Sequence, residues 1–338
     1  MVRMSAPDAR AGAIYDIGYQ HYDGKRLGRA GAVRALYAHG LRTVFGLGRG
    51  VRAKIAPVAL VAFVIVPAVI QAALAGLLGG GQIQLFTHEG YFRTTVWIFG
   101  LFCAFQTPEL VTGDQQHRVL ALYFSRALRR PDYVLARVGA LTTALFIVGL
   151  LPHIVLMFGQ YFSAADTLKA MKDSVPQLPR IVAAALVIAV LLSMVSLAIA
   201  AVIRRRPFAT AAILGALMVA SAFVTPLVIT RPDKMRYLVL ASPLMVGDGV
   251  TTWIFDTTKV KAPVDSAFFA PVAPPPAHAD SATMARHRAE VRRRSRGRER
   301  MTVIQIANLP GSLYLGTTAL LLIVSAGVLT LRYRHIET

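Results

Sequence analysis

The sequence predicts an all-α integral membrane protein with about six transmembrane helices. Three observations predict this class. The chain of 338 residues is 55% hydrophobic and its mean hydropathy is +0.53, values that soluble domains rarely reach. Apolar runs recur at about the 20-residue length that a helix needs to cross a bilayer. Most lysines and arginines stand between those runs, as in membrane proteins.

Six apolar runs are predicted to be the spans. They are 55–78, 91–111, 138–162, 181–203, 208–230 and 312–331. The second run is the weakest, because Arg93 and Glu109 lie near its ends. A seventh run, 237–255, is interrupted by Pro243, Asp248 and Gly249, and these residues favour a re-entrant pair of short helices over a seventh crossing.

The distribution of lysine and arginine predicts the orientation. Residues 1–54 hold ten of them and the loop 112–137 holds five, whereas residues 79–90 hold none. We therefore expect the N-terminus on the cytoplasmic side of the plasma membrane, with the C-terminal tail on the same side. The segment 231–311 carries thirteen and would lie outside, which long loops tolerate. If 237–255 were a true seventh span, the basic part of the segment 231–311 would instead lie on the cytoplasmic side.

The net charge of +20 also bears on partners. Anionic lipid headgroups and the cytoplasmic bias account for it, so we expect membrane lipid as a partner and no nucleic acid. The chain divides into a cytoplasmic arm (1–54), five spans with the loop 112–137 (55–230), a re-entrant segment with a long Pro- and Arg-rich loop (231–311), and the last span with its tail (312–338).

The end of the arm, residues 29–51, is predicted to be an amphipathic helix lying in the cytoplasmic interface. Tyr37 and Phe45 belong to its apolar face, and Arg34 and Arg42 belong to its charged face. The alternative is that these residues extend the first span.

The loop 112–137 mixes both charge signs with an apolar stripe, which suits docking to a cytoplasmic partner. The stripe comprises Leu120, Tyr123, Phe124 and Leu128, although Tyr123 and Phe124 could instead be interface anchors. We expect Pro131 to end a short helix. We expect Glu109 to pair with Arg118 or to join the docking surface. The candidate docking residues are Glu109, Asp114, Arg118, Tyr123, Arg126, Arg130, Asp132 and Tyr133.

Motifs for catalysis and for metal or nucleotide binding are missing from the sequence. The glycine cluster 46–50 lacks the Lys-Ser/Thr pair of a phosphate loop, and the eight histidines show no zinc-ligand spacing. We therefore expect no catalytic residue, metal or cofactor on this chain, and we expect His88 and Glu89 to be solvated. Any ATP and Mg²⁺ would be bound by another chain.

Polar residues inside the spans are few, and three are candidates for a path or for helix packing. They are His153, Gln71 and Gln106. His153 could line a path or could cap carbonyls freed by Pro152, and we favour the cap. Gln71 and Gln106 are expected to hydrogen-bond across helices.

Several motifs resemble the permease subunit of a type-2 ATP-binding-cassette exporter. Residues 14–20 and 24–29 resemble the arm of that family, and Ser242-Pro243-Leu244 with Gly249 and 253–255 resemble its segment after the fifth span. The loop carries Leu122-Tyr123, Arg126, Arg130 and Asp132-Tyr133 in a similar order. The insertion 258–305 departs from the family pattern.

The resemblance implies six spans, an interfacial helix, a re-entrant segment, and a loop coupled to a separate ATPase subunit. It also implies pairing with a second permease copy or a sibling permease. We therefore expect a permease that forms the translocation path of an ATP-driven exporter. The alternatives are a secondary carrier or channel, or a membrane scaffold. Spans without central carboxylates argue against an ion-coupled carrier.

Overall fold

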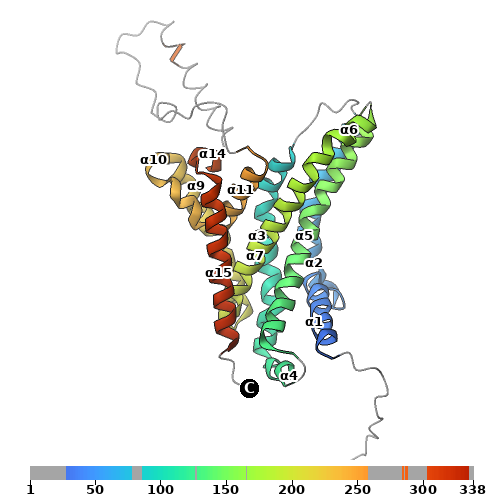
Figure 1. Ribbon diagram of the computed structural model, residues 1–338, viewed down its shortest axis with the longest axis vertical. Coiled ribbons are helices and arrows are strands. Elements are labelled where there is room, and N and C mark those ends of the chain that lie inside the picture. The colour runs from blue at the N-terminus through green and yellow to red at the C-terminus, as the bar shows by residue number, and fades with distance from the viewer. Residues whose placement is uncertain are drawn as a thin grey trace, which may run out of the picture.

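The computed structural model describes residues 28–77, 86–125, 128–164, 166–257, 284, 286–287 and 303–334 (Figure 1). The motif 14–20, Arg126 and nearly all of the insertion 258–305 lie outside these residues. Every regular element described is a helix. The elements are α1 (Gly28–Val44), α2 (Val51–Leu77), α3 (His88–Gln116), α4 (Leu120–Phe124), α5 (Arg130–Ser163), α6 (Thr167–Ser174), η1 (Val175–Gln177), α7 (Leu178–Val202), α8 (Arg206–Leu214), η2 (Gly215–Val219), α9 (Ala220–Thr230), α10 (Pro232–Met235), η3 (Arg236–Ala241), α11 (Pro243–Ile254), α14 (Val303–Ala307) and α15 (Gly311–Arg334).

Five helical stretches of the described chain are long and apolar enough to cross a membrane. They are Val51–Leu77, Arg130–Ser163, Thr167–Val202, Arg206–Thr230 and Gly311–Arg334. Each contains or overlaps one of the predicted runs, so the chain is an all-α membrane protein with several membrane-spanning helices. The stretch that contains α7 is the most enclosed, with 67% of its apolar window buried, and α2 is the least enclosed, with 17%. Hence α7 forms the centre of the bundle and α2 its edge.

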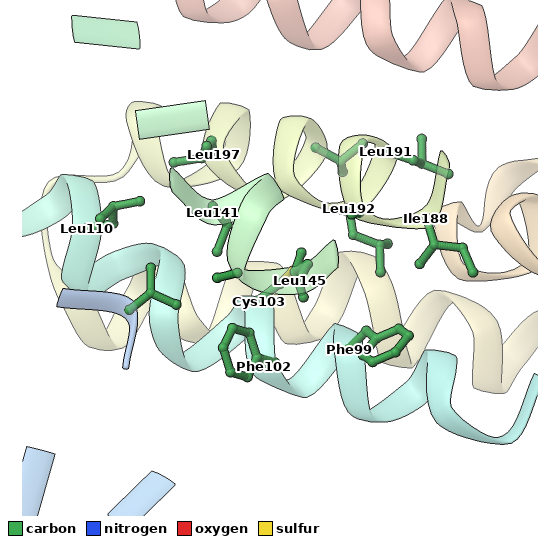
Figure 2. Close-up of a cluster of buried hydrophobic side chains, with 14 of the residues drawn as sticks. Phe99, Phe102, Cys103, Leu110, Leu141, Leu145, Ile188, Leu191, Leu192 and Leu197 are labelled. Carbon is green, nitrogen blue, oxygen red and sulfur yellow. The ribbon is translucent and has the colours of Figure 1, made fainter. Parts of the chain in front are cut away.

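The remaining predicted span, 91–111, belongs to α3. This helix has 29 residues and is about 44 Å long, enough to cross a bilayer. It is not among the five, and it carries Glu89, Arg93, Glu109 and Asp114 besides its apolar residues. Many of its apolar residues face the bundle: Figure 2 shows Phe99 and Phe102 in one cluster with side chains of α5 and α7, around the buried Cys103. Whether α3 is the sixth span stays a prediction.

A tight turn separates α1 from α2, so the residues of α1 do not extend the first span. Gly46 and Gly48 have φ values of +67° and +82°, which glycine adopts without strain. A Cβ atom on Gly46 would come within 2.6 Å of the Ala53 carbonyl oxygen. The helix ends at Val44, several residues before the predicted end at 51.

Pro131 does not end a helix as predicted. The short helix α4 already ends at Phe124, and Pro131 lies in the first turn of α5. A proline is well tolerated there, because the first turn leaves its backbone nitrogens without helical partners and the ring fixes a helical φ. The proline therefore starts the longest helix of the molecule.

The predicted interruption of residues 237–255 is confirmed beside Pro243, but it is wrong for Asp248 and Gly249, which lie inside the continuous helix α11. Pro232–Ala241 and Pro243–Ile254 form two helical pieces bent by 103°. Ser242 accepts a hydrogen bond from the Met245 backbone N–H at 3.4 Å and so caps the second piece. In Figure 1, α10, α11 and α14 lie together at the end of the bundle opposite α1 and α4. The bent pair is a re-entrant loop or one broken span, and the re-entrant form stays a prediction.

Candidate functional site

One end of the bundle gathers most of the residues that the sequence predicts to be functional. Figure 1 shows α1, α4, the start of α5 and the end of α15 at this end. The end of α3 and the turn between α7 and α8 join them through the side-chain contacts described below. We call this the basic end, since Arg29, Arg49, Arg137 and Arg206 all form ion pairs here.

Asp132 fixes α1 to α5. Both of its carboxylate oxygens accept hydrogen bonds from Arg29, at 2.7 Å from Nε and 2.6 Å from Nη2. The backbone N–H of Arg129 donates a third at 3.0 Å. This hydrogen-bonded pairing raises the pKa of Arg29 above its usual value. Asp132 is therefore occupied within the chain and not open for docking, and the two-point geometry holds one orientation of α1.

The rest of α1 packs against the same helix. The Tyr37 hydroxyl donates to Thr143 Oγ1 at 3.0 Å, and a Cβ atom on Gly40 would lie 2.9 Å from that of Ala140. Phe45 is half-buried, whereas Arg34 and Arg42 are exposed. The predicted division of α1 into an apolar and a charged face is thus confirmed. Its apolar face packs on protein, where Tyr37 and Phe45 are half-buried.

A second cluster joins α3, α5 and α15. Asp114 accepts a hydrogen bond from the Tyr133 hydroxyl at 2.7 Å and forms an ion pair with Arg137. The Arg137 guanidinium lies 5.4 Å from the Tyr133 ring, and Tyr333 packs on that ring at 5.2 Å. Only 2% of the Arg137 side chain is exposed.

Sequence reasoning missed Arg137 as a site residue, although it lies within the loop 112–137. The available signal was its spacing of four from Tyr133, which puts the two side chains on one helical face. A buried arginine is rare unless it is paired, and this one compensates Asp114.

Backbone carbonyls at the same end are also bound by side chains. Gln115 Nε2 and Arg332 Nε both donate to the Ala201 carbonyl oxygen at 3.0 Å, and Arg130 donates to the Arg334 carbonyl oxygen at 3.0 Å. These contacts satisfy helix carbonyls that lack partners within their own helices. They connect α15 to α3, α5 and α7.

Glu109 pairs with other arginines than the one predicted. It binds Arg49 at 2.6 Å, and both of its carboxylate oxygens bind Arg206, at 2.9 and 3.0 Å. Arg118 is exposed and holds a left-handed φ of +52°. The expected Glu109–Arg118 pair is therefore wrong, because the turn after α3 directs Arg118 elsewhere.

The short helix α4 presents a different face from the predicted apolar stripe. Leu120 and Leu128 are buried, and the rings of Tyr123 and Phe124 both lie 6.1 Å from that of Tyr133. The stripe thus packs inward. Leu122, by contrast, is 65% exposed.

The opposite end of the bundle contains a histidine pair. His153 Nδ1 lies 3.1 Å from His88 Nδ1, and its ring centroid lies 3.9 Å from that of Phe92. The preferred assignment of His153 as a cap for freed carbonyls is wrong, because its Nδ1 contacts a side chain and its Nε2 has no hydrogen-bond partner. His88 is only 6% exposed, so the expectation that it is solvated is also wrong.

Gln71 does not form the expected hydrogen bond to another helix, and the expectation for Gln106 stays a prediction. Gln71 accepts a hydrogen bond from the Phe86 backbone N–H at 2.8 Å and donates to the Phe86 carbonyl oxygen at 3.1 Å. It therefore ties α2 to the segment before α3, not to another helix. Gln106 is buried inside α3.

The residues predicted to form the re-entrant segment lie near the histidine end. Pro243 begins α11, and Asp248 forms an ion pair with Arg93 at 3.5 Å. Gly249 faces the Tyr314 ring so closely that any Cβ atom there would clash with it. Tyr314 and Asp248 thus mark where α15, α11 and α3 meet.

Within the described residues, no group of three or more His, Cys, Asp or Glu side chains is placed to hold a metal ion. Neither the protein-family models nor the curated proteins compared with this chain match it. The resemblance to exporter permeases therefore remains a hypothesis that rests on the quoted motifs and on the geometry above.

Proposed function

We propose that this chain is the membrane-spanning permease subunit of an ATP-driven exporter of the type-2 ATP-binding-cassette class. One observation supports this most strongly. At the basic end, α1 and the segment that contains α4 are connected through paired side chains to α3, α5 and α15. A force applied to this end by a partner would reach three long helices through short contacts.

The orientation follows the charge distribution. The basic end holds the excess of arginine and faces the cytoplasm of a bacterial cell, where anionic lipid and the ATPase both lie. With α3 counted as a span, the six crossings are α2, α3, α5, α7, the α8–α9 pair and α15.

In this proposal the ATPase binds ATP and Mg²⁺ and docks on the outer face of α4. Closure of two ATPase subunits pushes α4 and α1. The Arg29–Asp132 pair passes the movement to α5, and the cluster of Asp114, Arg137 and Tyr333 passes it to α3 and α15. Two permease copies, or this chain and a sibling, enclose the translocation path, and this chain itself breaks no bond.

The docking surface can be tested with a pair of matched substitutions. Leu122→Glu places a charge on the exposed face of α4. Leu168→Glu is the control, because Leu168 is 62% exposed on α6 at the other end of the bundle. Tagged chain is purified from its own membranes and labelled with 8-azido-ATP.

We expect a labelled partner chain with the native protein and with Leu168→Glu, and strongly reduced label with Leu122→Glu. If both variants retain the labelled partner equally, α4 is not the docking surface. Label on the permease itself would contradict a separate ATPase.

Transport measurements distinguish the exporter from the alternative functions, a secondary carrier or a scaffold. Inverted vesicles should accumulate cargo with ATP, lose uptake with vanadate and keep it with a proton uncoupler. Uptake that collapses with the uncoupler would indicate a secondary carrier. A chain that binds a labelled ATPase without transport in either condition would indicate a scaffold.

A further inference from the structure

The end of the bundle opposite the basic end contains a cavity that the coupling proposal does not use. It lies between α3, α9, α11 and α14 and has a volume of about 260 Å³. Small-molecule pockets in proteins start at roughly 300 Å³, so the space suits a small ligand or the head of a larger one. Its polar lining comes from Arg93, Asp248 and Thr225, and Trp97 forms part of the wall.

The charges around this cavity do not balance. Arg93 is shared by two carboxylates, because it pairs with Glu89 one turn earlier on α3 and with Asp248 on α11. The group of three carries one net negative charge. The side chains of Glu89 and Asp248 are only 12% and 13% exposed, so water screens this charge poorly.

Asp248 is the less well paired carboxylate. Its distance to Arg93 Nε is 3.5 Å, and no hydrogen bond reaches Asp248 Oδ1 or Arg93 Nε, although both atoms are buried. Arg93 donates its hydrogen bond to Glu89 instead. A buried carboxylate without a hydrogen-bonded cation is unfavourable at membrane depth, and a bound cation would relieve it.

The other lining groups select the kind of cation. Val96, Leu244, Met245 and Ile304 make most of the wall apolar. Trp97 is 36% exposed and offers an indole, the aromatic ring that attracts cations best. The Thr225 hydroxyl donates to the Ser221 carbonyl oxygen at 2.9 Å, so its own oxygen can still accept a hydrogen bond.

A metal ion would need several oxygen ligands, which this wall does not supply. An anion would meet a net negative charge. The remaining chemistry is that of a lipophilic organic cation.

We propose that this cavity binds the cationic head of an amphiphile, a quaternary or protonated amine with an apolar group. Asp248 is its counter-ion, Trp97 is the cation–π surface, and the apolar wall holds the adjoining carbon atoms. This inference rests on the proposed function, since it makes lipophilic monocations the cargo class of the exporter.

The test measures binding to the full chain alone, without ATP or an ATPase. The probe is tritiated hexyltrimethylammonium, and the protein is held in phosphatidylcholine nanodiscs with empty nanodiscs subtracted. Hexyl sulfate, with the same chain and the opposite charge, is the competitor that should fail. Because no nucleotide is involved, a negative result here leaves the α4 docking test unaffected, and a failed docking test leaves this binding measurable.

We expect saturable binding of the cation that Asp248→Asn weakens about tenfold or more. Asp256→Asn is the matched control, because Asp256 is exposed just beyond α11 and holds a left-handed φ of +57° that asparagine also tolerates. This control should bind as the native chain does. Trp97→Leu, at a partly exposed position, is a second variant and should weaken binding several-fold.

Three results would each overturn the proposal. They are no saturable binding above empty nanodiscs, equal affinity in the native chain and in both the Asp248→Asn and Trp97→Leu variants, or competition by hexyl sulfate as strong as by unlabelled cation.

Discussion

The two ends of the bundle treat their carboxylates in opposite ways. At the basic end, Glu109, Asp114 and Asp132 are each bound by at least one arginine, and four arginines serve the three of them. At the other end, Glu89 and Asp248 share Arg93. The first arrangement fixes helices to one another. The second leaves negative charge beside a cavity, which suits an end that receives a ligand.

Loss of Arg137 should have the largest effect on stability. Arg137→Met removes the buried partner of Asp114 and leaves that carboxylate uncompensated, so we expect a loss of about 3 kcal/mol. Thermal unfolding in one detergent measures the change. Combining Arg137→Met with Asp114→Asn should restore more than half of the loss, because no unpaired charge then remains. A double variant as unstable as the single one would show that packing, not charge, makes Arg137 important.

A carboxylate removed from the other end should act with the opposite sign. Asp248→Asn deletes a buried charge whose Oδ1 accepts no hydrogen bond, so we expect unchanged or higher stability, by up to about 1 kcal/mol. The same unfolding measurement applies. A marked destabilisation by Asp248→Asn would mean that the two ends do not differ in the way described.

Glu109→Gln should cost less than Arg137→Met. The side chain is 31% exposed and its partners Arg49 and Arg206 are also partly exposed, so solvent weakens both ion pairs. We expect a loss of about 1 kcal/mol. The loss should shrink in high salt, since salt screens exposed pairs. A loss of stability that does not depend on salt would mean that the ion pairs of Glu109 are shielded from solvent.

The smallest effect concerns pH at the basic end. Burial and the nearby Arg137 lower the pKa of His39 below its usual value, so the folded chain binds this proton less readily than the unfolded chain. Stability should therefore be full above about pH 7 and fall slightly as the pH drops through the unfolded pKa, near 6.5. His39→Gln should flatten that part of the stability profile between pH 8 and pH 5. His117→Gln, at an exposed histidine after α3, is the control for removing a histidine.

Much of the fold could be predicted from the sequence. The spans at 55–78, 138–162, 181–203, 208–230 and 312–331 each fall in a helix that is apolar and long enough to cross a membrane. The separate helix α1 and the bend beside Pro243 were also predictable, since glycine and proline act through local backbone geometry. Pro131 was misjudged, because the same restriction that ends one helix can begin the next.

The candidate site was less predictable. Membership of the loop 112–137 was enough to select Asp114 and Asp132, but not to find that both are held inside the chain. One of the two predictions for Glu109 paired it with Arg118, nine residues away, whereas its partners are 60 residues before it and 97 residues after it. His88 and His153 are 65 residues apart, and neither sequence neighbourhood indicates the other.

The sequence by itself determined that the apolar helices of this protein belong in a membrane, and it determined the secondary structure. Hydropathy over 20 residues and the positions of glycine and proline are local quantities, and they select membrane helices and their breaks without reference to the rest of the chain. Only the tertiary structure decided which charges meet. Helix packing brings Arg29 to Asp132 and leaves Asp248 beside an arginine already shared with Glu89, and such pairings depend on the angle and register of packed helices.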